Sequence, residues 1–150
     1  MLVTPNANAL RQALLAPRSV VLVGQSNDPG KTAGRPLSYL RRAGFGGTIY
    51  SVNARRDTVL GERAYPSVAA LPEVPDHAYI LLPTEAVIGA VAECGRAGVT
   101  IATILAAGFS ETGPEGAARE QQLREVAARP ASGSSDPPAS GWSTCVMGCC

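Results

Sequence analysis

Three glycines and two basic residues lie close together in residues 24–35, directly after an apolar run. Gly24, Gly30 and Gly34 permit tight turns and let backbone N–H groups approach a phosphate, and Lys31 and Arg35 add positive charge. The spacing is longer than G-x-G-x-x-G, so the dinucleotide-binding fingerprint is absent. The segment predicts a loop that binds a phosphate-bearing ligand. For Lys31 and Arg35, an ordinary surface charge is the other interpretation.

A second pair of basic residues follows the next apolar run. NAD enzymes usually carry Asp or Glu at this point to bind the adenosine ribose, but here Asn53 is followed by Arg55 and Arg56. A guanidinium group suits a phosphate monoester, so the pattern predicts a phosphate on or near the ribose of the ligand. NADP and coenzyme A both satisfy this prediction. The alternative is that both arginines are solvated loop charges.

The other reactive side chains favour no catalytic site. His77 begins an apolar run at the end away from these loops, and Ser26 lacks the complete G-x-S-x-G pattern of a nucleophile. Glu111 and Glu115 are typical of residues that cap and charge a helix N-terminus. The sequence therefore predicts a binding protein without catalytic residues of its own.

The elements that must position these residues alternate along the chain. We expect strands that are apolar along their whole length, at 19–23, 48–52, 77–82 and 100–105. We expect helices at 6–15, 34–43, 84–97 (with Thr84 as N-cap) and 114–129, and a helical turn at 67–71. This order predicts an α/β fold, a Rossmann-like doubly wound parallel sheet. Ligands of such sheets bind at the carboxyl ends of the strands, where these loops lie.

Length and charge narrow the class of protein. The 150 residues suit a single domain, and a net charge of +1 gives no field that would attract nucleic acid. No apolar stretch is long enough to span a membrane and no secretory signal is readable, so we expect a cytoplasmic protein. The tail cysteines Cys145, Cys149 and Cys150 lack a matching second pair or a nearby histidine, and we expect no metal site.

The last twenty-one residues break the alternation. A fifth strand should follow the last helix, but residues 130–141 are rich in Pro, Gly, Ser and Ala and cannot pair as a central strand. We therefore expect a domain at 1–129 and a disordered low-complexity tail at 130–150, with the fifth strand lost. The exposed edge of the fourth strand would then favour homodimerisation or aggregation.

Four segments in this order resemble one known family. They are V-L-V-G-Q-S-N-D-P-G-K-T-A-G, I-Y-S-V-N, Y-I-L-L-P and A-A-G-F-S-E-T-G, within residues 8–129. The chain resembles the CoA-binding domain of NDP-forming acyl-CoA synthetases, which is related to the succinyl-CoA ligase alpha subunit and to stand-alone CoA-binding proteins. The resemblance implies that the chain binds coenzyme A, or an acyl-CoA, as a small-molecule ligand.

The resemblance also implies a role for each segment. Gly24, Ser26, Lys31 and Gly34 would line the phosphate loop, and Asn53 and Arg55 would lie near the adenosine phosphate. Pro83 and Thr84 would border the adenine, and Ala107, Gly108 and Phe109 would guide the pantetheine arm.

The chain departs from this family at two points. The phosphate-relaying histidine domain and the ATP-grasp domain of the full ligases are absent, so the resemblance implies a module without turnover that needs the missing ligase domains as partners. The alternative is an NADP-binding oxidoreductase or a nucleotide-sensing Rossmann protein.

The tail suggests its own origin. Permitted codons from Ala131 onward can be read in another frame as I-R-I-V-G-P-S-S-L-G-V-V-D-L, which has the expected fifth strand and a motif similar to the family's G-P-N-x-x-G. Our hypothesis is that residues 130–150 are a frameshift product of a longer ligase gene.

Overall fold

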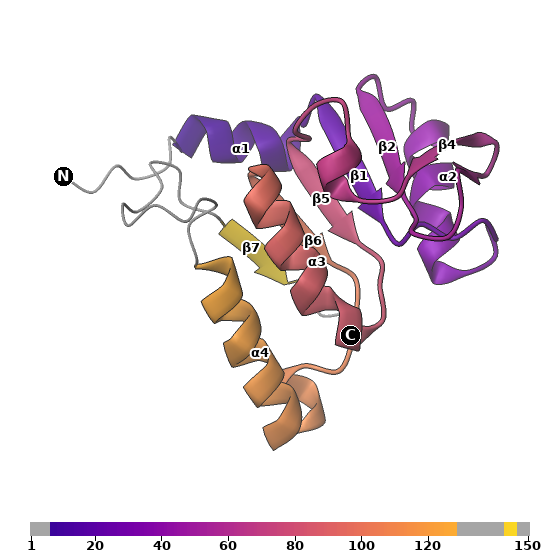
Figure 1. The fold of residues 1–150 in the computed structure, drawn as a ribbon. Coiled ribbons are helices and arrows are strands. Elements are labelled where there is room, and N and C mark those ends of the chain that lie inside the picture. Colours follow the sequence, from indigo (N-terminus) through magenta and orange to yellow (C-terminus); the bar gives the residue numbers. More distant parts are fainter. Residues whose placement is uncertain (1–6, 129–142, 147–150) are drawn as a thin grey trace.

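The computed structural model of the protein describes residues 7–128 and 143–146 (Figure 1). Its centre is a seven-stranded sheet in the order β3-β4-β2-β1-β5-β6-β7. The strands are β1 (Ser19–Val23), β2 (Thr48–Val52), β3 (Thr58–Val59), β4 (Glu62–Tyr65), β5 (His77–Ile80), β6 (Ile101–Ile104) and β7 (Ser143–Val146). All neighbouring strands are parallel except the short β3–β4 pair. This arrangement confirms the Rossmann-like doubly wound parallel sheet.

Four α-helices of the described residues accompany the sheet. They are α1 (Ala7–Leu15), α2 (Arg35–Arg42), α3 (Thr84–Ala97) and α4 (Pro114–Ala127). Short 3₁₀ turns precede α2 and α4, and a third lies between β4 and β5, as η1 (Thr32–Gly34), η3 (Ser110–Thr112) and η2 (Val68–Ala70). The predicted helices and the predicted helical turn are therefore all present. At the end of α3, Gly98 adopts φ +88°, the left-handed conformation that glycine allows at a helix C-terminus.

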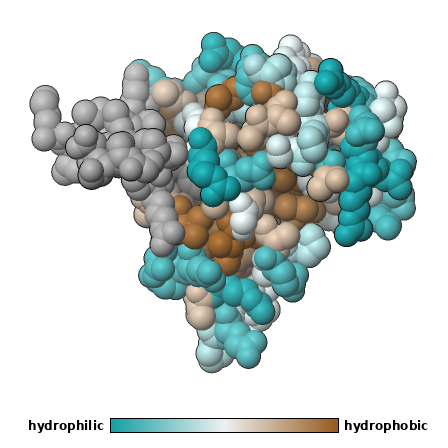
Figure 2. Space-filling view, viewed as in Figure 1, coloured by the Kyte–Doolittle hydropathy of each residue, from teal (hydrophilic) through white to brown (hydrophobic). Residues whose placement is uncertain are grey.

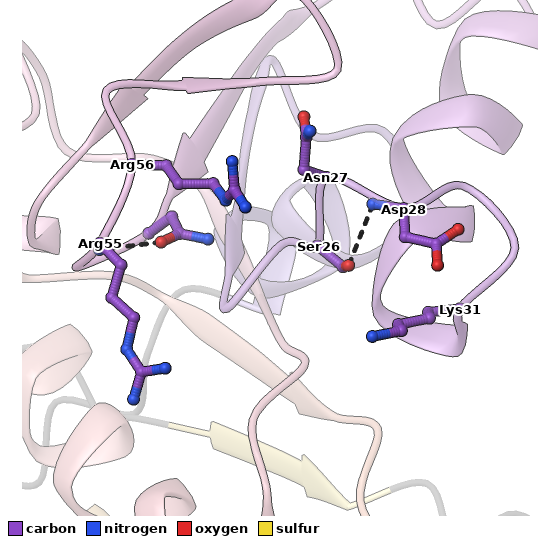
Figure 3. A pocket seen from close by; sticks show the side chains of 7 residues that line it. Ser26, Asn27, Asp28, Lys31, Arg55 and Arg56 are labelled. Carbon is purple, nitrogen blue, oxygen red and sulfur yellow. Dashed lines mark hydrogen bonds between the residues drawn. The ribbon is translucent and has the colours of Figure 1, made fainter.

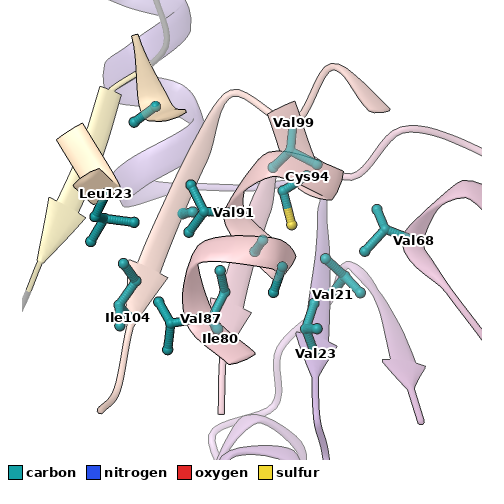
Figure 4. Close-up of a cluster of buried hydrophobic side chains, with 14 of the residues drawn as sticks. Val21, Val23, Val68, Ile80, Val87, Val91, Cys94, Val99, Ile104 and Leu123 are labelled. Atoms are coloured by element: carbon teal, nitrogen blue, oxygen red, sulfur yellow. The ribbon is translucent and has the colours of Figure 1, made fainter. Parts of the chain in front are cut away.

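The alternation of side chains along the strands gives the sheet two apolar faces. Val21, Ile80 and Ile104 lie on the face that packs against α3 and α4, together with Val91 and Leu123 of these helices (Figure 4). Residues one position along point to the other face, where Leu22 packs with Leu37 of α2. Because both faces are covered, the central strands carry no polar face, and this explains their continuous apolar runs.

Two of the strands, β3 and β4, lie in a segment that the sequence predicts as a polar loop. β4 pairs in parallel with β2, and β3 returns alongside β4. Only Val59 and Ala64 of these strands are buried, so their apolar signal is too short to distinguish them from a loop. They extend the sheet on the side next to β2.

At the opposite side of the sheet, the prediction of a lost fifth strand is wrong for residues 143–146. These residues form β7, which pairs in parallel with β6, Ile101 opposite Ser143 and Ile104 opposite Val146. Without β7, the strand β6 would present unpaired N–H and C=O groups at the edge of the sheet. The sequence Ser-Thr-Cys-Val of residues 143–146 contains two β-branched residues, which favour a strand. The predicted disorder of the rest of the tail lies outside the described residues.

Apolar residues gather around α3 in the middle of the face shown in Figure 2, and hydrophilic residues surround them. No helix of the described residues is long and apolar enough to cross a membrane.

Candidate functional site

The loops that follow β1, β2, β5 and β6 meet at one end of the sheet, because these four strands are neighbours and parallel. In such sheets the ligand lies outside the carboxyl ends of the strands, where the direction of the connections changes. In this sheet β1 lies between β2 and β5: the chain first continues from β1 to β2 on one side and later adds β5 on the other side. The crevice is therefore expected between the loops that follow these three strands.

The loop after β1 is folded tightly on itself. Gly24 has φ +86°, which only glycine adopts readily, and the amide of Ser26 donates to the carbonyl oxygen of Ala33 at 2.9 Å. A Cβ atom on Gly34 would lie 1.9 Å from the carbonyl oxygen of Asp28. This close approach of residue 34 to the Asp28 carbonyl group therefore requires glycine at position 34.

Side chains within this loop hold its tip. The Oγ atom of Ser26 accepts from the Asp28 amide at 3.1 Å, and Oδ1 of Asp28 accepts from the Gly30 amide at 2.9 Å. Arg35 donates from Nη2 to the carbonyl oxygen of Gly30 at 3.2 Å. Arg35 therefore supports the loop and does not line the hollow described below, whereas Lys31 does.

The end of β2 is joined to this loop by Asn53. Its Nδ2 donates to the carbonyl oxygen of Gln25 at 3.1 Å, and its Oδ1 accepts from the Arg55 amide at 2.9 Å. The second bond makes a turn that Asn and Asp side chains typically form, and it places Arg55 and Arg56 beside the β1 loop.

A hollow of about 650 Å³ lies between these two loops, and we call it the cationic hollow. Arg55 and Arg56 approach it from one side and Lys31 from the other, with Ser26 between them (Figure 3). Its lining residues are Ser26, Asn27, Asp28, Lys31, Asn53, Arg55 and Arg56. Three positive charges face the single carboxylate of Asp28, so the hollow favours an anion such as a phosphate.

A second hollow, of about 660 Å³, adjoins the first and shares Asn53 and Arg55 with it; we call it the apolar hollow. The strand ends and the start of α3 form most of its wall. The other lining residues are Val23, Gly24, Val52, Ala54, Pro66, Leu82, Pro83, Ala86, Gly89, Ala90 and Glu93. A ligand that extends from the cationic hollow past Arg55 would enter a space suited to a flat apolar group.

The loop after β6 is held by three side chains. The hydroxyl of Thr84 donates to the carbonyl oxygen of Ala107, and Arg119 donates to that of Gly108 at 3.1 Å. Oε1 of Glu111 accepts from the amides of Gly108, at 2.5 Å, and of Phe109, at 3.1 Å. The bond from the Gly108 amide is the main reason that the pKa of Glu111 lies below its usual value.

One of these bonds differs from a sequence prediction. Thr84 is the first residue of α3, whose N-cap is Pro83, and its hydroxyl donates to Ala107. The predicted place of the acidic residues at helix N-termini is confirmed: Glu111 lies in the first turn of η3 and accepts from the amide of its N-cap, Phe109, and Glu115 lies in the first turn of α4.

The structure brings six of the twelve predicted site residues to the two hollows. Ser26, Lys31, Asn53 and Arg55 line the cationic hollow, and Gly24 and Pro83 line the apolar hollow together with Asn53 and Arg55. The other six support the loops or lie in the β6 loop without lining either hollow; they are Gly34, Arg35, Thr84, Ala107, Gly108 and Phe109.

Sequence reasoning missed several lining residues. Asn27 and Asp28 lie inside the predicted loop and could have been included on that ground. Gly89 lies three residues after Ala86, and Glu93 lies three residues after Ala90, so all four share one face of α3; this helical spacing was the available signal. Pro66 follows β4, which the sequence did not reveal.

His77 lies inside the sheet and away from both hollows. It is buried, with Nε2 at 2.8 Å from Oγ1 of Thr103 and Nδ1 at 3.1 Å from the carbonyl oxygen of Ala13. Burial lowers the pKa of His77, and it raises that of the buried Cys94 thiol to about 12. Among the described residues, no three His, Cys, Asp or Glu side chains are grouped so as to hold a metal ion.

The fold and the two hollows define a Rossmann-like domain whose strand-end loops suit a phosphate-bearing nucleotide. Residues 18–133 match the model of a family described as "CoA binding domain", and the chain belongs to this family.

Proteins similar to the chain include acid–CoA ligases. It is 42% identical over 118 residues to an acetate–CoA ligase [ADP-forming] I of Archaeoglobus fulgidus, and 40% identical over 111 residues to the alpha subunit of the acetate–CoA ligase [ADP-forming] II of Pyrococcus furiosus. These matches cover 79% and 74% of this chain, but only 17% and 24% of the relatives. The chain therefore corresponds to a small part of each ligase.

A solved structure has the same fold. The apo form of a dinucleotide-forming acetyl-coenzyme A synthetase 1 of Ca. Korarchaeum cryptofilum superimposes with a TM-score of 0.73 at 34% identity. The match covers 77% of this chain and 25% of that one.

Proposed function

We propose that this chain binds coenzyme A across the two hollows, as the CoA-binding module of an NDP-forming acyl-CoA ligase, without turnover by itself. The observation that carries the proposal is the position of Arg55, which lines both hollows. A ligand with a phosphate on its ribose would place that phosphate beside Arg55, Arg56 and Lys31 and its base in the apolar hollow.

The catalytic partners would be other domains or subunits of the ligase. Both hollows are lined mainly by the strand ends, the loops after them and α3, and the carboxylates among their described lining residues each accept from a backbone amide, Asp28 from Gly30 and Glu93 from Val68. Coenzyme A with or without an acyl group is expected to bind equally, because the thiol lies at the end of the ligand away from the phosphate and the base.

Isothermal titration of the purified, reduced chain tests the proposal. Coenzyme A, acetyl-CoA, dephospho-CoA and NADPH are titrated separately under the same buffer and salt. We expect coenzyme A and acetyl-CoA to bind alike, and dephospho-CoA to bind at least about tenfold more weakly, since it lacks the phosphate that charged side chains would hold.

Two results would count against the proposal. Binding of NADPH in preference to coenzyme A would identify a nicotinamide-dependent protein instead. Equal affinities for coenzyme A and dephospho-CoA would show that the cationic hollow does not hold the ribose phosphate.

A further inference from the structure

One face of α3 forms a wall of the apolar hollow. Ala86, Gly89, Ala90 and Glu93 all line it, at the spacing that places residues on the same side of a helix. The first three have no side chain beyond Cβ, so this wall is flat, and it ends at a carboxylate.

Gly89 lies in the middle of α3, where glycine weakens a helix relative to alanine. A Cβ atom at this position would meet no other atom of the described chain within 4 Å. Packing within the domain therefore does not require glycine here. The open space over Gly89 belongs to the apolar hollow and suits a planar ring that lies against the helix.

Glu93 is held in a fixed position beside this space. Its Oε1 accepts from the backbone amide of Val68 at 2.7 Å, and the residue is half-buried. A carboxylate has two oxygens and about four acceptor positions, so this bond leaves capacity for a donor in the hollow. The rest of the wall is largely apolar, with Val52, Leu82 and Pro83 among its residues.

The charges give the ligand a direction. The carboxylate of Glu93 disfavours a phosphate in the apolar hollow, whereas Lys31, Arg55 and Arg56 favour one in the cationic hollow. A bound nucleotide would thus place its neutral base against Gly89, and an N–H donor of that base would face Glu93.

We propose that Glu93 selects a purine with an amino group at C6, and that Gly89 provides the flat surface on which this ring lies. The inference rests on the proposed binding of coenzyme A. Adenine offers an N–H donor to the carboxylate. Hypoxanthine held in the same orientation would bring a carbonyl oxygen at C6 to the carboxylate, and two acceptors facing each other would repel.

The test compares adenosine 3′,5′-bisphosphate with inosine 3′,5′-bisphosphate, by isothermal titration of the full chain. We expect the adenosine compound to bind at least about tenfold more tightly, as a hydrogen bond to a charged group implies. In Glu93→Gln the amide oxygen can still accept from Val68, while its NH₂ group can donate to a carbonyl. The preference should therefore fall to about twofold or less. Glu85→Gln, an exposed charge change on the same helix outside both hollows, should leave it unchanged.

A second variant tests the hollow without altering Glu93. Gly89→Leu favours the helix but places a side chain where the ring would lie, so the adenosine compound should bind at least about tenfold more weakly while the melting temperature does not fall.

The outcomes separate the two proposals. If the chain binds coenzyme A but treats both bisphosphates alike, or if Glu93→Gln keeps the full preference, the role of Glu93 is refuted and coenzyme A binding stands. Normal binding by Gly89→Leu would refute the position of the ring. A chain that binds neither coenzyme A nor either bisphosphate would refute both proposals.

Discussion

The side chain of Asn53 donates from Nδ2 to the carbonyl oxygen of Gln25 at 3.1 Å, and this bond joins the loop after β2 to the loop after β1. The Oδ1 atom of the same side chain accepts from the Arg55 amide. One amide thus sets the distance between the two sides of the cationic hollow and also orients its arginine-bearing turn.

Asn53→Asp should therefore weaken coenzyme A binding by at least about tenfold. The carboxylate can still accept from Arg55 but cannot donate to Gln25, and it adds a negative charge where a phosphate is proposed to bind. The measurement is titration with coenzyme A, alongside a thermal melt. Gln122→Glu is the matched control, since it adds the same charge at an exposed position on α4. Unchanged affinity in Asn53→Asp would contradict the proposed joining role.

Arg55→Ala should reduce the preference for coenzyme A over dephospho-CoA by about tenfold or more, because the guanidinium is proposed to bind the ribose phosphate. Arg63→Ala is the control: Arg63 is exposed, lies 4.9 Å from the centre of the Tyr65 ring, and lines neither hollow. Added salt should weaken wild-type binding more than that of Arg55→Ala. A preference that survives in Arg55→Ala would assign the phosphate to another group.

The sequence is sufficient to predict the central sheet, because β1, β2, β5 and β6 are short apolar runs and helices of clear period lie between β1 and β2 and between β5 and β6. It is insufficient for β3 and β4, which contribute few buried residues, and for β7, a run of only four residues that pairs with β6 at the side of the sheet.

The site was predictable to a similar degree. The glycine loop and the arginines after β2 were identified from their residue types and from the rule that ligands bind at strand ends. Arg35 donates to the carbonyl oxygen of Gly30, and Thr84 donates to that of Ala107. These partners come within reach only in the folded loops, so the sequence does not reveal them.

Gly34→Ala should destabilise the domain by about 1–3 kcal/mol, the usual cost of forcing an atom into a packed site. The added Cβ would lie 1.9 Å from the carbonyl oxygen of Asp28, so the loop after β1 must shift. Chemical denaturation measures the loss, and coenzyme A affinity should fall with it. Gly46→Ala is the control, because a Cβ there meets nothing within 4 Å. Equal stability of the two variants would show that the close approach at Gly34 is not required.

The frameshift hypothesis for residues 130–150 remains a proposal, and the coding sequence tests it directly. We expect the codons from Ala131 onward, read in the alternative frame, to give I-R-I-V-G-P-S-S-L-G-V-V-D-L. Codons for these residues that are incompatible with this second frame would refute the hypothesis.

His77 should make the stability of the domain fall as the pH is lowered below about 6.5, the ordinary pKa of histidine. Burial lowers the pKa of His77 in the folded chain, so the unfolded chain takes up a proton at a higher pH than the folded chain does. The contribution of His77 to the stability is therefore fully present above its pKa in the unfolded chain. It decreases as the pH falls toward its lower pKa in the folded chain. Denaturant unfolding between pH 7.5 and 5.5 measures this slope.

The variant His77→Gln isolates the contribution of this residue, since His77 is the only histidine of the chain. It should be less stable than wild type at pH 7.5, because the bonds to Thr103 and Ala13 are altered, but its stability should depend less on pH. Glu125→Gln, an exposed change on α4 of a different ionisable type, should keep the wild-type slope. If wild type and His77→Gln lose stability equally across this range, the slope arises from other groups, and the buried imidazole does not link folding to pH.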